Sequence, residues 1–252
     1  MAVTLSEGER ARYARQIILR EIGGSGQRRL KAAHVAVIGV GGIGSPAILY
    51  LAAAGIGHLR MIDDDRVDMS NLQRQIAFAA DDAGRGKAIA AAGAATRLNP
   101  NVAVEPIATR IDADNARALL EGADVVVDGC DNFATRLAVS DAALSLRIPL
   151  VSAAVGQFEG QLAVYRGWEA DRPCYRCLVG TSPDREEANC AEQGVLGPVT
   201  GMLGSMAALE AIRALVPFGD DPAGRLVLLD LLGLRFRSVS LPKDPGCPAC
   251  RR

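Results

Sequence analysis

Histidine and aromatic residues are scarce in this chain: two of its 252 residues are histidine, and 4% are aromatic. Histidine is the side chain most often used as a general base or as a catalytic metal ligand. His34 and His58 stand at or near the starts of apolar stretches and are interpreted as structural residues. A serine–histidine triad and a histidine-based catalytic zinc centre are therefore not expected.

Long apolar runs and a strong charge imbalance are also missing. No apolar run reaches the roughly 18–20 residues that a membrane-spanning helix needs. Residues 1–13 are polar and lack the apolar core of a signal peptide. The formal net charge is −1, so bulk charge does not point to nucleic acid. These absences predict a cytoplasmic protein with no membrane and no nucleic-acid partner, in which six cysteines do not form a disulfide set.

The most informative stretch is residues 34–46, HVAVIGVGGIGSP. Its apolar, β-branched start is typical of a buried parallel strand. A G-x-G-x-x-G pattern then places Gly39, Gly41 and Gly44 before an apolar segment of helical length, residues 46–54. Without Cβ atoms, such a turn lets backbone N–H groups approach a phosphate at the positive end of a helix. The stretch predicts a nucleotide site.

Strands and helices alternate through the first 153 residues, which predicts an α/β fold: a doubly wound, mostly parallel, Rossmann-like sheet. The expected strands are 35–38, 57–62, 102–108, 123–128 and 149–152, and the expected helices are 46–54, 86–98, 112–120 and 132–146. A capping box at Ser6 and Glu9 predicts an N-terminal helix that carries Arg15, and a short helix is expected around residues 26–32.

The pattern changes after residue 153. An antiparallel hairpin over residues 157–166 is expected to turn near Glu159 and Gly160, and residues 171–194 are expected to form a long loop. A buried helix over 198–216 and two antiparallel strands, 225–231 and 234–240, follow. We interpret residues 1–252 as one domain with a nucleotide-binding half, about 1–153, and a partner-binding half, about 154–252.

Asp63 adds to the nucleotide interpretation. It follows the second predicted strand by the spacing at which an acidic residue binds ribose hydroxyls. This geometry suits any adenosine ligand, so a nicotinamide cofactor remains open at this point. Asp64 and Asp65 are interpreted as solvated loop charges.

The next loop and helix supply polar and basic groups at the same sheet edge. The loop S-N-L-Q-R-Q, residues 70–75, includes Asn71 and Arg74, which suit phosphate oxygens. Lys87 lies near the start of the next helix, where the alternative is a solvated helix terminus. Three such groups exceed the needs of a dinucleotide site and suit a triphosphate.

The fourth strand ends at D-G-C-D-N, residues 128–132. Asp128 or Asp131 could hold Mg²⁺ against phosphates. The alternative for Asp131 is that it caps the following helix. Cys130 is flanked by acids that would raise its pKa, so it is interpreted as structural.

Four of the remaining cysteines form two C-x-x-C pairs, Cys174 with Cys177 and Cys247 with Cys250. Two such pairs are typical of a closed, tetrahedral Zn²⁺ site. Such a site would link the C-terminal tail to the loop that contains Cys174 and Cys177. Redox-active pairs are the alternative. Cys190 stands alone in a predicted loop, either as an incidental thiol or as a nucleophile.

Taken together, these segments resemble the MoeB/ThiF family, relatives of the ubiquitin-activating enzymes. The resemblance runs through RYARQ (12–16), the glycine turn, SNLQRQ (70–75), DGCDN (128–132), CYRC (174–177) and GVLGP (194–198). Members of this family adenylate the C-terminal Gly-Gly carboxylate of a ubiquitin-like sulfur-carrier protein, using ATP and Mg²⁺.

The resemblance also implies roles for residues. Asp63 would bind ribose, while the phosphates would be bound by Asn71, Arg74 and Lys87, and Mg²⁺ by Asp131. Arg15 would reach into the site of a second subunit, which makes a homodimer the active unit. Further nucleotide contacts are expected from Gly42, Ser70, Gln73 and Asn132.

The resemblance also bears on the sulfur donor and the carrier. No rhodanese domain follows the second cysteine pair, so a separate donor, a cysteine desulfurase or rhodanese-like protein, is expected. In the ThiF branch the cysteine at the position of Cys190 takes part in sulfur transfer, whereas the MoeB branch adenylates without it. The segments DDD (63–65) and VGQF (155–158) lean towards ThiF, so the carrier would be ThiS-like or MoaD-like, serving thiamine or molybdopterin biosynthesis.

Two rival functions remain. A nicotinamide-dependent oxidoreductase rests on the glycine turn and Asp63 alone. A non-catalytic scaffold, like the inactive half of a heterodimeric activating enzyme, would be expected to lack Arg15, Arg74 and Lys87, which this chain keeps.

Overall fold

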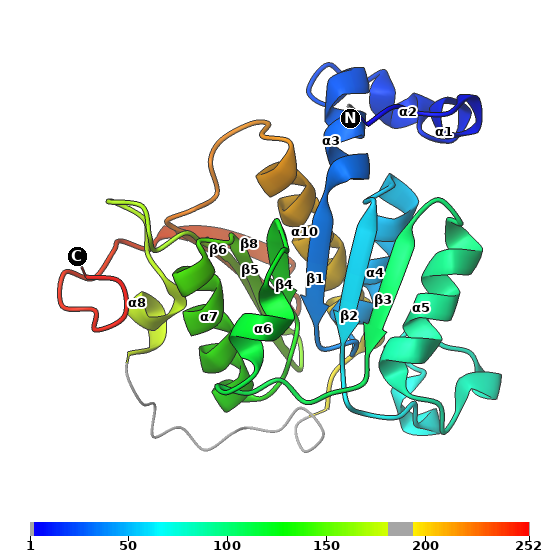
Figure 1. The fold of residues 1–252 in the computed structure, drawn as a ribbon. Helices are drawn as coiled ribbons and strands as arrows, with labels where there is room; N and C mark the ends of the chain where they lie inside the picture. The colour runs from blue at the N-terminus through cyan, green and yellow to red at the C-terminus, as the bar shows by residue number, and fades with distance from the viewer. Residues whose placement is uncertain (1–2, 181–193, 252) are drawn as a thin grey trace.

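A single eight-stranded sheet organises the computed structural model, which describes residues 3–180 and 194–251. The strand order is β3-β2-β1-β4-β5-β6-β7-β8 (Figure 1). The first five positions are parallel, and β6, β7 and β8 continue the sheet antiparallel. The strands are β1 His34–Ile38, β2 His58–Ile62, β3 Ala103–Ile107, β4 Val125–Asp128, β5 Leu150–Gly156, β6 Glu159–Tyr165, β7 Arg225–Asp230 and β8 Arg235–Ser240. The predicted α/β class, with antiparallel C-terminal strands, is confirmed.

Helices cover both faces of the sheet, as a buried parallel sheet requires. One core lies under α4, α5 and α10 and contains Val35 and Leu203, and the other lies under α6 and α7 and contains Ala36 and Leu120. Alternate residues of β1 therefore serve opposite cores. The helices are α3 Gly23–Ala32, α4 Gly44–Ala54, α5 Lys87–Leu98, α6 Ala116–Leu120, α7 Phe133–Leu146, α8 Tyr175–Val179 and α10 Gly197–Leu215.

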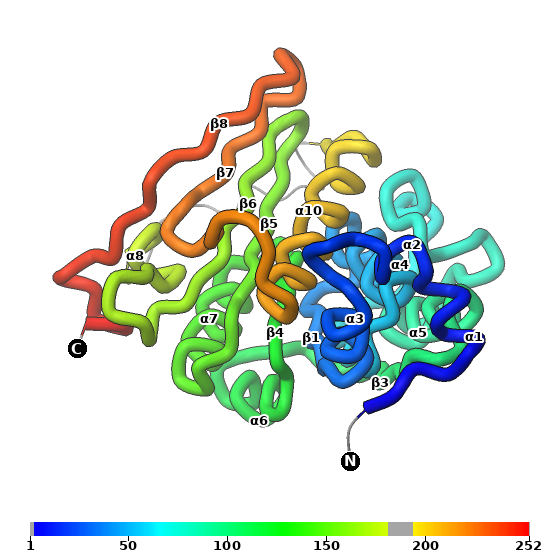
Figure 2. Tube along the Cα trace, turned by 90° about the horizontal axis from the view of Figure 1, so that it is seen from above, coloured from blue at the N-terminus to red at the C-terminus, as the bar shows by residue number. Residues whose placement is uncertain are grey.

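The N-terminal helices pack at the amino end of the parallel strands. The predicted capping box is present, since Ser6 Oγ accepts from the Glu9 backbone N–H. The expected helix is broken at Tyr13 into α1 Glu7–Arg12 and α2 Ala14–Ile17. Tyr13 is buried there, and its hydroxyl accepts a hydrogen bond from Asn99 Nδ2, just beyond the end of α5. Figures 1 and 2 show α1–α3 gathered at this one end of the molecule.

Two expected elements differ in the structure. The helix expected from residue 112 begins at Ala116, because Asp112 and Asn115 side chains bind each other's backbone N–H groups. The hairpin expected within 157–166 is instead formed by β5 and β6, with its turn at residues 157 and 158. The start of β5 reads like a buried parallel strand, which concealed its pairing with β6.

The segment after β6 is more structured than expected. Helix α8 occupies part of the expected loop and begins after Cys174. Helix α10 confirms the expected buried helix, with proline in its first turn. None of the helices described is both long enough and apolar enough to cross a bilayer.

Candidate nucleotide site and cysteine cluster

A cavity of about 720 Å³ opens at the carboxyl ends of β1, β2 and β4. Ligands bind at this edge in open α/β sheets. Its lining includes most of the residues expected to bind a nucleotide: Gly39, Gly41, Gly42, Asp63, Ser70, Asn71, Arg74, Lys87, Asp131 and Asn132. The structure thus brings together four segments that are far apart in the sequence.

The glycine turn is shaped by close backbone contacts. Gly39 has a φ of +77°, a left-handed conformation that favours glycine. A Cβ on Gly44 would lie 1.9 Å from the Gly39 carbonyl oxygen, so this glycine closes the turn rather than facing the cavity. A Cβ on Gly41 would meet only Gln75 Nε2, at 3.8 Å. A side chain at position 41 would therefore project into the space that a phosphate group needs.

Asp63 is anchored against this turn. Its Oδ2 accepts from the Val40 N–H at 2.7 Å, and its Oδ1 accepts from the Asp65 N–H at 2.9 Å. Burial raises the pKa of Asp63, while the Lys87 charge and these hydrogen bonds act in the opposite direction. Each carboxylate oxygen has a second lone pair, which can accept a hydrogen bond from a ribose hydroxyl.

Lys87 begins α5 and is almost fully buried, with 7% of its surface exposed. Its ammonium group lies 2.8 Å from Asp65 Oδ2, and the backbone N–H of Lys87 donates to the Asp65 carbonyl oxygen. Asp65 is an exposed loop residue, as expected, and its carboxylate also pairs with Lys87 across 22 positions. The pair holds a buried positive charge at the cavity wall.

The loop after β2 brings a second cation. Arg74 Nη1 donates to the Ser70 carbonyl oxygen at 3.3 Å, and no other hydrogen bond joins its guanidinium to residues 3–180 or 194–251. Ser70 itself donates to Asp68, which caps the short 3₁₀ helix Met69–Asn71. Gln73 is exposed and lies outside the cavity lining, unlike Asn71 and Arg74. The forked donor of Arg74 is therefore available to a ligand.

The two acidic residues at the end of β4, Asp128 and Asp131, lie in different surroundings. Asn132, not Asp131, caps α7, since its side chain accepts from the Thr135 N–H. This leaves the Asp131 carboxylate exposed at the cavity. Asp128, the other magnesium candidate, is 1% exposed and paired with Arg136. Asp131 thus fits a hydrated Mg²⁺ better than Asp128 does.

The buried guanidinium of Arg136 was not anticipated. It donates to Asp128 Oδ2 at 3.2 Å, to the Ala153 carbonyl oxygen at 2.8 Å and to the Cys130 carbonyl oxygen. Asp128 also accepts from Ser152. Burial and Asp128 raise the pKa of the Cys130 thiol, consistent with its structural interpretation. This network ties α7 to β4 and β5 beneath the cavity, a contact that no local motif signals.

The start of α10 is a second missed component. Thr200 lines the cavity, and a Cβ on Gly42 would lie 3.0 Å from its side chain. A Cβ on Gly197 would lie 2.2 Å from the Gln73 carbonyl oxygen. In the sequence, Gly197 and Pro198 indicate where this helix begins. They do not indicate that its first turn contacts Gly42 and the Gln73 carbonyl oxygen.

Arg15 lies far from the cavity of its own chain. It is exposed on α2, and its neighbour Gln16 donates to the Ala54 carbonyl oxygen at the far end of α4. The cavity is at the other end of this helix, which spans 11 residues, or about 16 Å. Arg15 cannot serve this cavity, although a second copy of the chain could bring its own.

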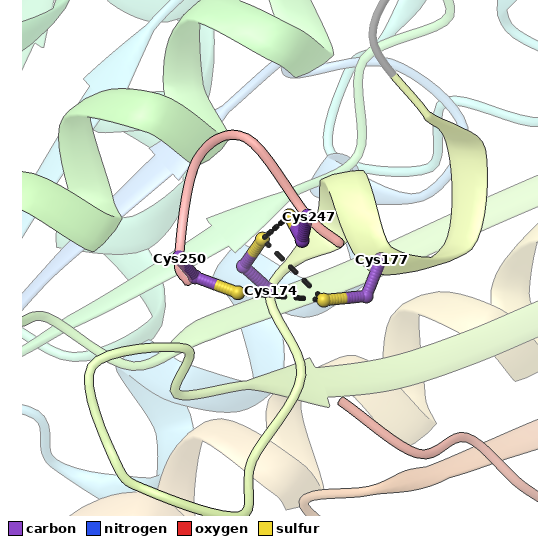
Figure 3. A group of neighbouring side chains, drawn as sticks. All are labelled: Cys174, Cys177, Cys247 and Cys250. Atoms are coloured by element: carbon purple, nitrogen blue, oxygen red, sulfur yellow. Dashed lines mark hydrogen bonds between the residues drawn. The ribbon is translucent and has the colours of Figure 1, made fainter. Parts of the chain in front are cut away.

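The two cysteine pairs converge on one point (Figure 3). The Sγ–Sγ distances are 3.9 Å for Cys174–Cys177, 3.6 Å for Cys174–Cys247 and 3.4 Å for Cys177–Cys250. Disulfide sulfurs lie about 2.05 Å apart, whereas a tetrahedral zinc with Zn–S bonds of about 2.3 Å holds sulfurs about 3.8 Å apart. The four thiols could hold Zn²⁺, so a metal site fits better than redox pairs.

Burial raises the pKa of Cys174 and, to about 11, that of Cys250. Zinc would supply the charge that keeps these sulfurs as thiolates. Next to the cluster, Arg176 donates to both carboxylate oxygens of Asp141, which joins α8 to α7. Cys190 lies outside the described residues.

Comparisons with known proteins agree with this geometry. The ThiF family profile matches residues 13–249. The chain is 43% identical to the SAMP-activating enzyme E1 of Haloferax volcanii, over 99% of this chain and 92% of that protein. It is also 43% identical to the sulfur carrier protein adenylyltransferase of Thermus thermophilus, over 95% of this chain and 90% of that protein.

One further relative is longer. The adenylyltransferase and sulfurtransferase MOCS3 of Anopheles gambiae is 46% identical over 98% of this chain, which spans 56% of that protein. Among solved structures, Escherichia coli MccB with ATP has a TM-score of 0.82 at 23% identity, covering 96% of this chain and 75% of that chain. At this identity the structural likeness shows the fold alone. The family profile and the near full-length relatives confirm the resemblance expected from the sequence: the chain belongs to the ThiF family.

Proposed function

We propose that this chain is an adenylyltransferase that uses ATP to activate the C-terminal carboxylate of a ubiquitin-like sulfur-carrier protein. The observation that carries the proposal is the cavity, where a glycine turn, Asp63, Arg74, Lys87 and Asp131 meet at one sheet edge. The names of the relatives support the same reaction class. Neither the oxidoreductase nor the scaffold hypothesis accounts for the two cations.

The reaction needs charge stabilisation rather than a general base. A C-terminal carboxylate is ionised at neutral pH. One of its oxygens forms a bond to the α-phosphorus of ATP while the bond to the β-phosphate oxygen breaks, which gives an acyl adenylate and pyrophosphate. Lys87 and Arg74 would lower the repulsion between the two anions and stabilise the leaving group. Asp63 would orient the ribose, and the glycine turn would hold the phosphates.

Asp131 is the residue that we assign to Mg²⁺, because its carboxylate is exposed at the cavity and not used as a helix cap. A bound Mg²⁺ would neutralise phosphate charge. We likewise assign Zn²⁺ to the four-cysteine cluster, where it would hold the C-terminal tail against α8.

A surface for the carrier runs from the cavity to the β7–β8 turn. Val155 and Val195 line the cavity, and the next turn carries Phe158, whose carbonyl oxygen accepts from the Leu231 N–H. Beyond it, Leu232 and Leu234 are 78% and 72% exposed. With Phe158 and Phe236, which are 37% and 50% exposed, they form a group of exposed apolar side chains around this end of the sheet, and such groups are typical of interaction surfaces. We propose that the carrier body sits on this surface while its Gly-Gly tail enters past Val195.

Exchange of labelled pyrophosphate into ATP tests the function. With a Gly-Gly-ended carrier present, the protein should catalyse exchange, because acyl-adenylate formation is reversible. A carrier shortened by its last two residues should give none and serves as the control. Absence of exchange with every Gly-Gly carrier of the source cell, or tight binding of NADH without binding of ATP, would refute the proposal.

The carrier surface predicts a separate effect. Leu234→Asp should raise the KM for the carrier about tenfold or more, since a charge would replace an apolar contact in the bound state. The KM for ATP should stay unchanged, because position 234 lies outside the cavity lining. Leu98→Asp, an exposed apolar residue at the end of α5, is the matched control. Equal carrier KM values for the two variants would refute the surface.

We also propose a homodimer in which Arg15 of one copy serves the cavity of the other. Supporting it, exposed apolar side chains lie beside Arg15 and on the neighbouring helices: Ile18 is 75%, Tyr50 57% and Ile89 49% exposed. Arg15→Ala and Lys87→Ala proteins should each be inactive. Mixed and allowed to exchange subunits, they should regain about one quarter of wild-type exchange, because half the dimers then hold one intact site. No recovery in a sample shown to contain mixed dimers would show that Arg15 does not serve the cavity of the other copy.

The identity of the carrier, ThiS-like or MoaD-like, is open to direct measurement. Pull-down from the source lysate with ATP, followed by mass spectrometry, would identify the carrier and its thiocarboxylate. A desulfurase or rhodanese-like protein recovered with it would be the sulfur donor that the sequence resemblance implies.

A further inference from the structure

The chain's two histidines lie side by side at the amino end of the sheet, opposite the nucleotide cavity. His34 and His58 are register partners in the parallel pair β1–β2, so their side chains leave the same face. Their ring centroids are 4.0 Å apart, with a 30° angle between the ring planes. Twenty-four positions of sequence separate them, and only the strand pairing brings them together.

Glu105 completes the group. It stands two positions after Ala103, the register partner of His58 on β3, and therefore shares the face of both histidines. Its Oε2 lies 3.3 Å from His58 Nε2. One possible ligand atom from each of the three residues lies within 4.8 Å of the other two. Three adjacent strands thus each contribute one metal-binding side chain.

The position of His34 is unusual because the same face of β1 is otherwise apolar. Farther along β1 it presents Ala36 and Ile38, both buried in the core under α6 and α7. His34 Nε2 is buried and has no hydrogen-bond partner in the part of the chain that the structure describes. Leaving a buried polar nitrogen without a partner costs free energy, so such an atom calls for an explanation.

A neutral histidine ring binds a metal ion through the lone pair of one ring nitrogen. In metal-binding histidines the other ring nitrogen usually donates a hydrogen bond to a carbonyl or carboxylate. The buried and unpartnered Nε2 of His34 therefore suits a metal ligand.

We propose that His34, His58 and Glu105 form a binding site for one divalent transition-metal ion, with Zn²⁺ as the representative. Two imidazoles and a carboxylate favour zinc, cobalt, nickel or copper over magnesium and calcium. A tetrahedral zinc with bonds of about 2.0–2.1 Å holds its ligand atoms about 3.3 Å apart. The His58–Glu105 distance already matches, and the two rings must turn from their stacked position towards the ion.

Hydrogen bonds hold the carboxylate of this group in place. Arg60 Nε donates to Glu105 Oε2 at 2.9 Å, and its Nη1 donates to the Leu119 carbonyl oxygen at 2.8 Å. The remaining lone pairs of the Glu105 carboxylate are available to a metal. The Asp124 carboxylate accepts from the His34 backbone N–H and adds negative charge nearby. The bound ion would cross-link β1, β2 and β3 at the end remote from the nucleotide, leaving at least one coordination position for water.

Nuclear magnetic resonance can test the site directly, because the imidazole spectrum contains only two residues. Protein with a histidine-free tag, and with its cysteine cluster already loaded, is titrated with ZnCl₂ while ¹⁵N–¹H long-range spectra are recorded. Both Nε2 resonances should shift and saturate with one equivalent of zinc per chain. Spectra in which neither ring, or only one, responds would overturn the proposal.

Variants provide the second measurement. In calorimetry, His34→Gln and His58→Gln should each raise the Kd for the added zinc ion by more than about 100-fold. Removing a group that only hydrogen-bonds to a metal ligand already lowers metal affinity by about 10–100-fold. Glu121→Gln, a nearby exposed carboxylate, should bind zinc like the wild type and serves as the control. Thermal melting confirms that each variant is folded. Zinc binding that survives in both folded histidine variants would show that the ion binds elsewhere.

Discussion

Lys87→Ala should reduce carrier-dependent exchange of pyrophosphate into ATP by about 10²–10³-fold, the loss expected when one buried group that stabilises developing charge is removed. The ammonium group is almost fully buried and held at the cavity wall by Asp65, 2.8 Å away. Being fixed in place, it needs no reorganisation as charge moves onto pyrophosphate. Its loss should therefore lower kcat more than it raises the KM for ATP.

The fold should survive this change. The Asp65 side chain is 67% exposed, so its carboxylate stays hydrated when its partner is removed. Arg97→Ala is the matched control, because Arg97 is an exposed cation in the last turn of the same helix. Circular dichroism melts of both variants establish folding. A Lys87→Ala protein that exchanges pyrophosphate as fast as Arg97→Ala would remove Lys87 from the mechanism.

Cys174→Ala should eliminate the zinc bound by the cysteine cluster and lower the melting temperature strongly. Cys174 Sγ lies within 3.9 Å of both Cys177 Sγ and Cys247 Sγ, and three remaining thiols cannot close a tetrahedral structural site. Structural zinc binding contributes apparent free energies of about 10–16 kcal/mol in isolated zinc-finger peptides. Here a large separate core remains, so we expect the tail and α8 to detach while the sheet stays folded.

Metal analysis and hydrogen exchange measure these two consequences. Both are measured in a His34→Gln background, which lacks the histidine site proposed above. Zinc should fall from about one equivalent per chain to none, and exchange should accelerate in residues 242–251 and in α8. Cys130→Ala is the control, because that thiol lies at the nucleotide cavity, away from the cluster. Zinc retained by Cys174→Ala in this background, or absent from otherwise unchanged protein purified with zinc, would contradict the assignment.

The parts of the fold that could be predicted from the sequence are encoded by contiguous residues. The glycine turn, the capping box and the individual strands and helices each depend on residues that are close together in the sequence. The hairpin was misplaced because strand pairing is a long-range property: β5 pairs with β4 on one side and β6 on the other. The apolar sequence at its start is compatible with either partner.

Parts of the candidate site could likewise be predicted from the sequence, and other parts could not. Residue types and spacing were sufficient to nominate Asp63, Arg74, Lys87 and Asp131, and the cavity brings all four together. The choice between Asp131 and Asp128 depended on which side chain is buried against Arg136, eight positions from Asp128. Spacing alone did not pair Lys87 with Asp65 either.

What the sequence determined by itself is the chemistry available to this protein: a glycine turn of the kind that suits phosphate, cations near it, and thiols in zinc-like pairs. Local backbone sterics and side-chain chemistry are sufficient for that. Which groups meet was decided only by the tertiary structure. Strand register places His34 beside His58, and the packing of α7 places Arg136 against Asp128. The packing of α2 against the end of α4, where Gln16 bonds Ala54, keeps the neighbouring Arg15 away from the cavity. Each of these contacts joins elements whose relative position depends on packing of the whole sheet.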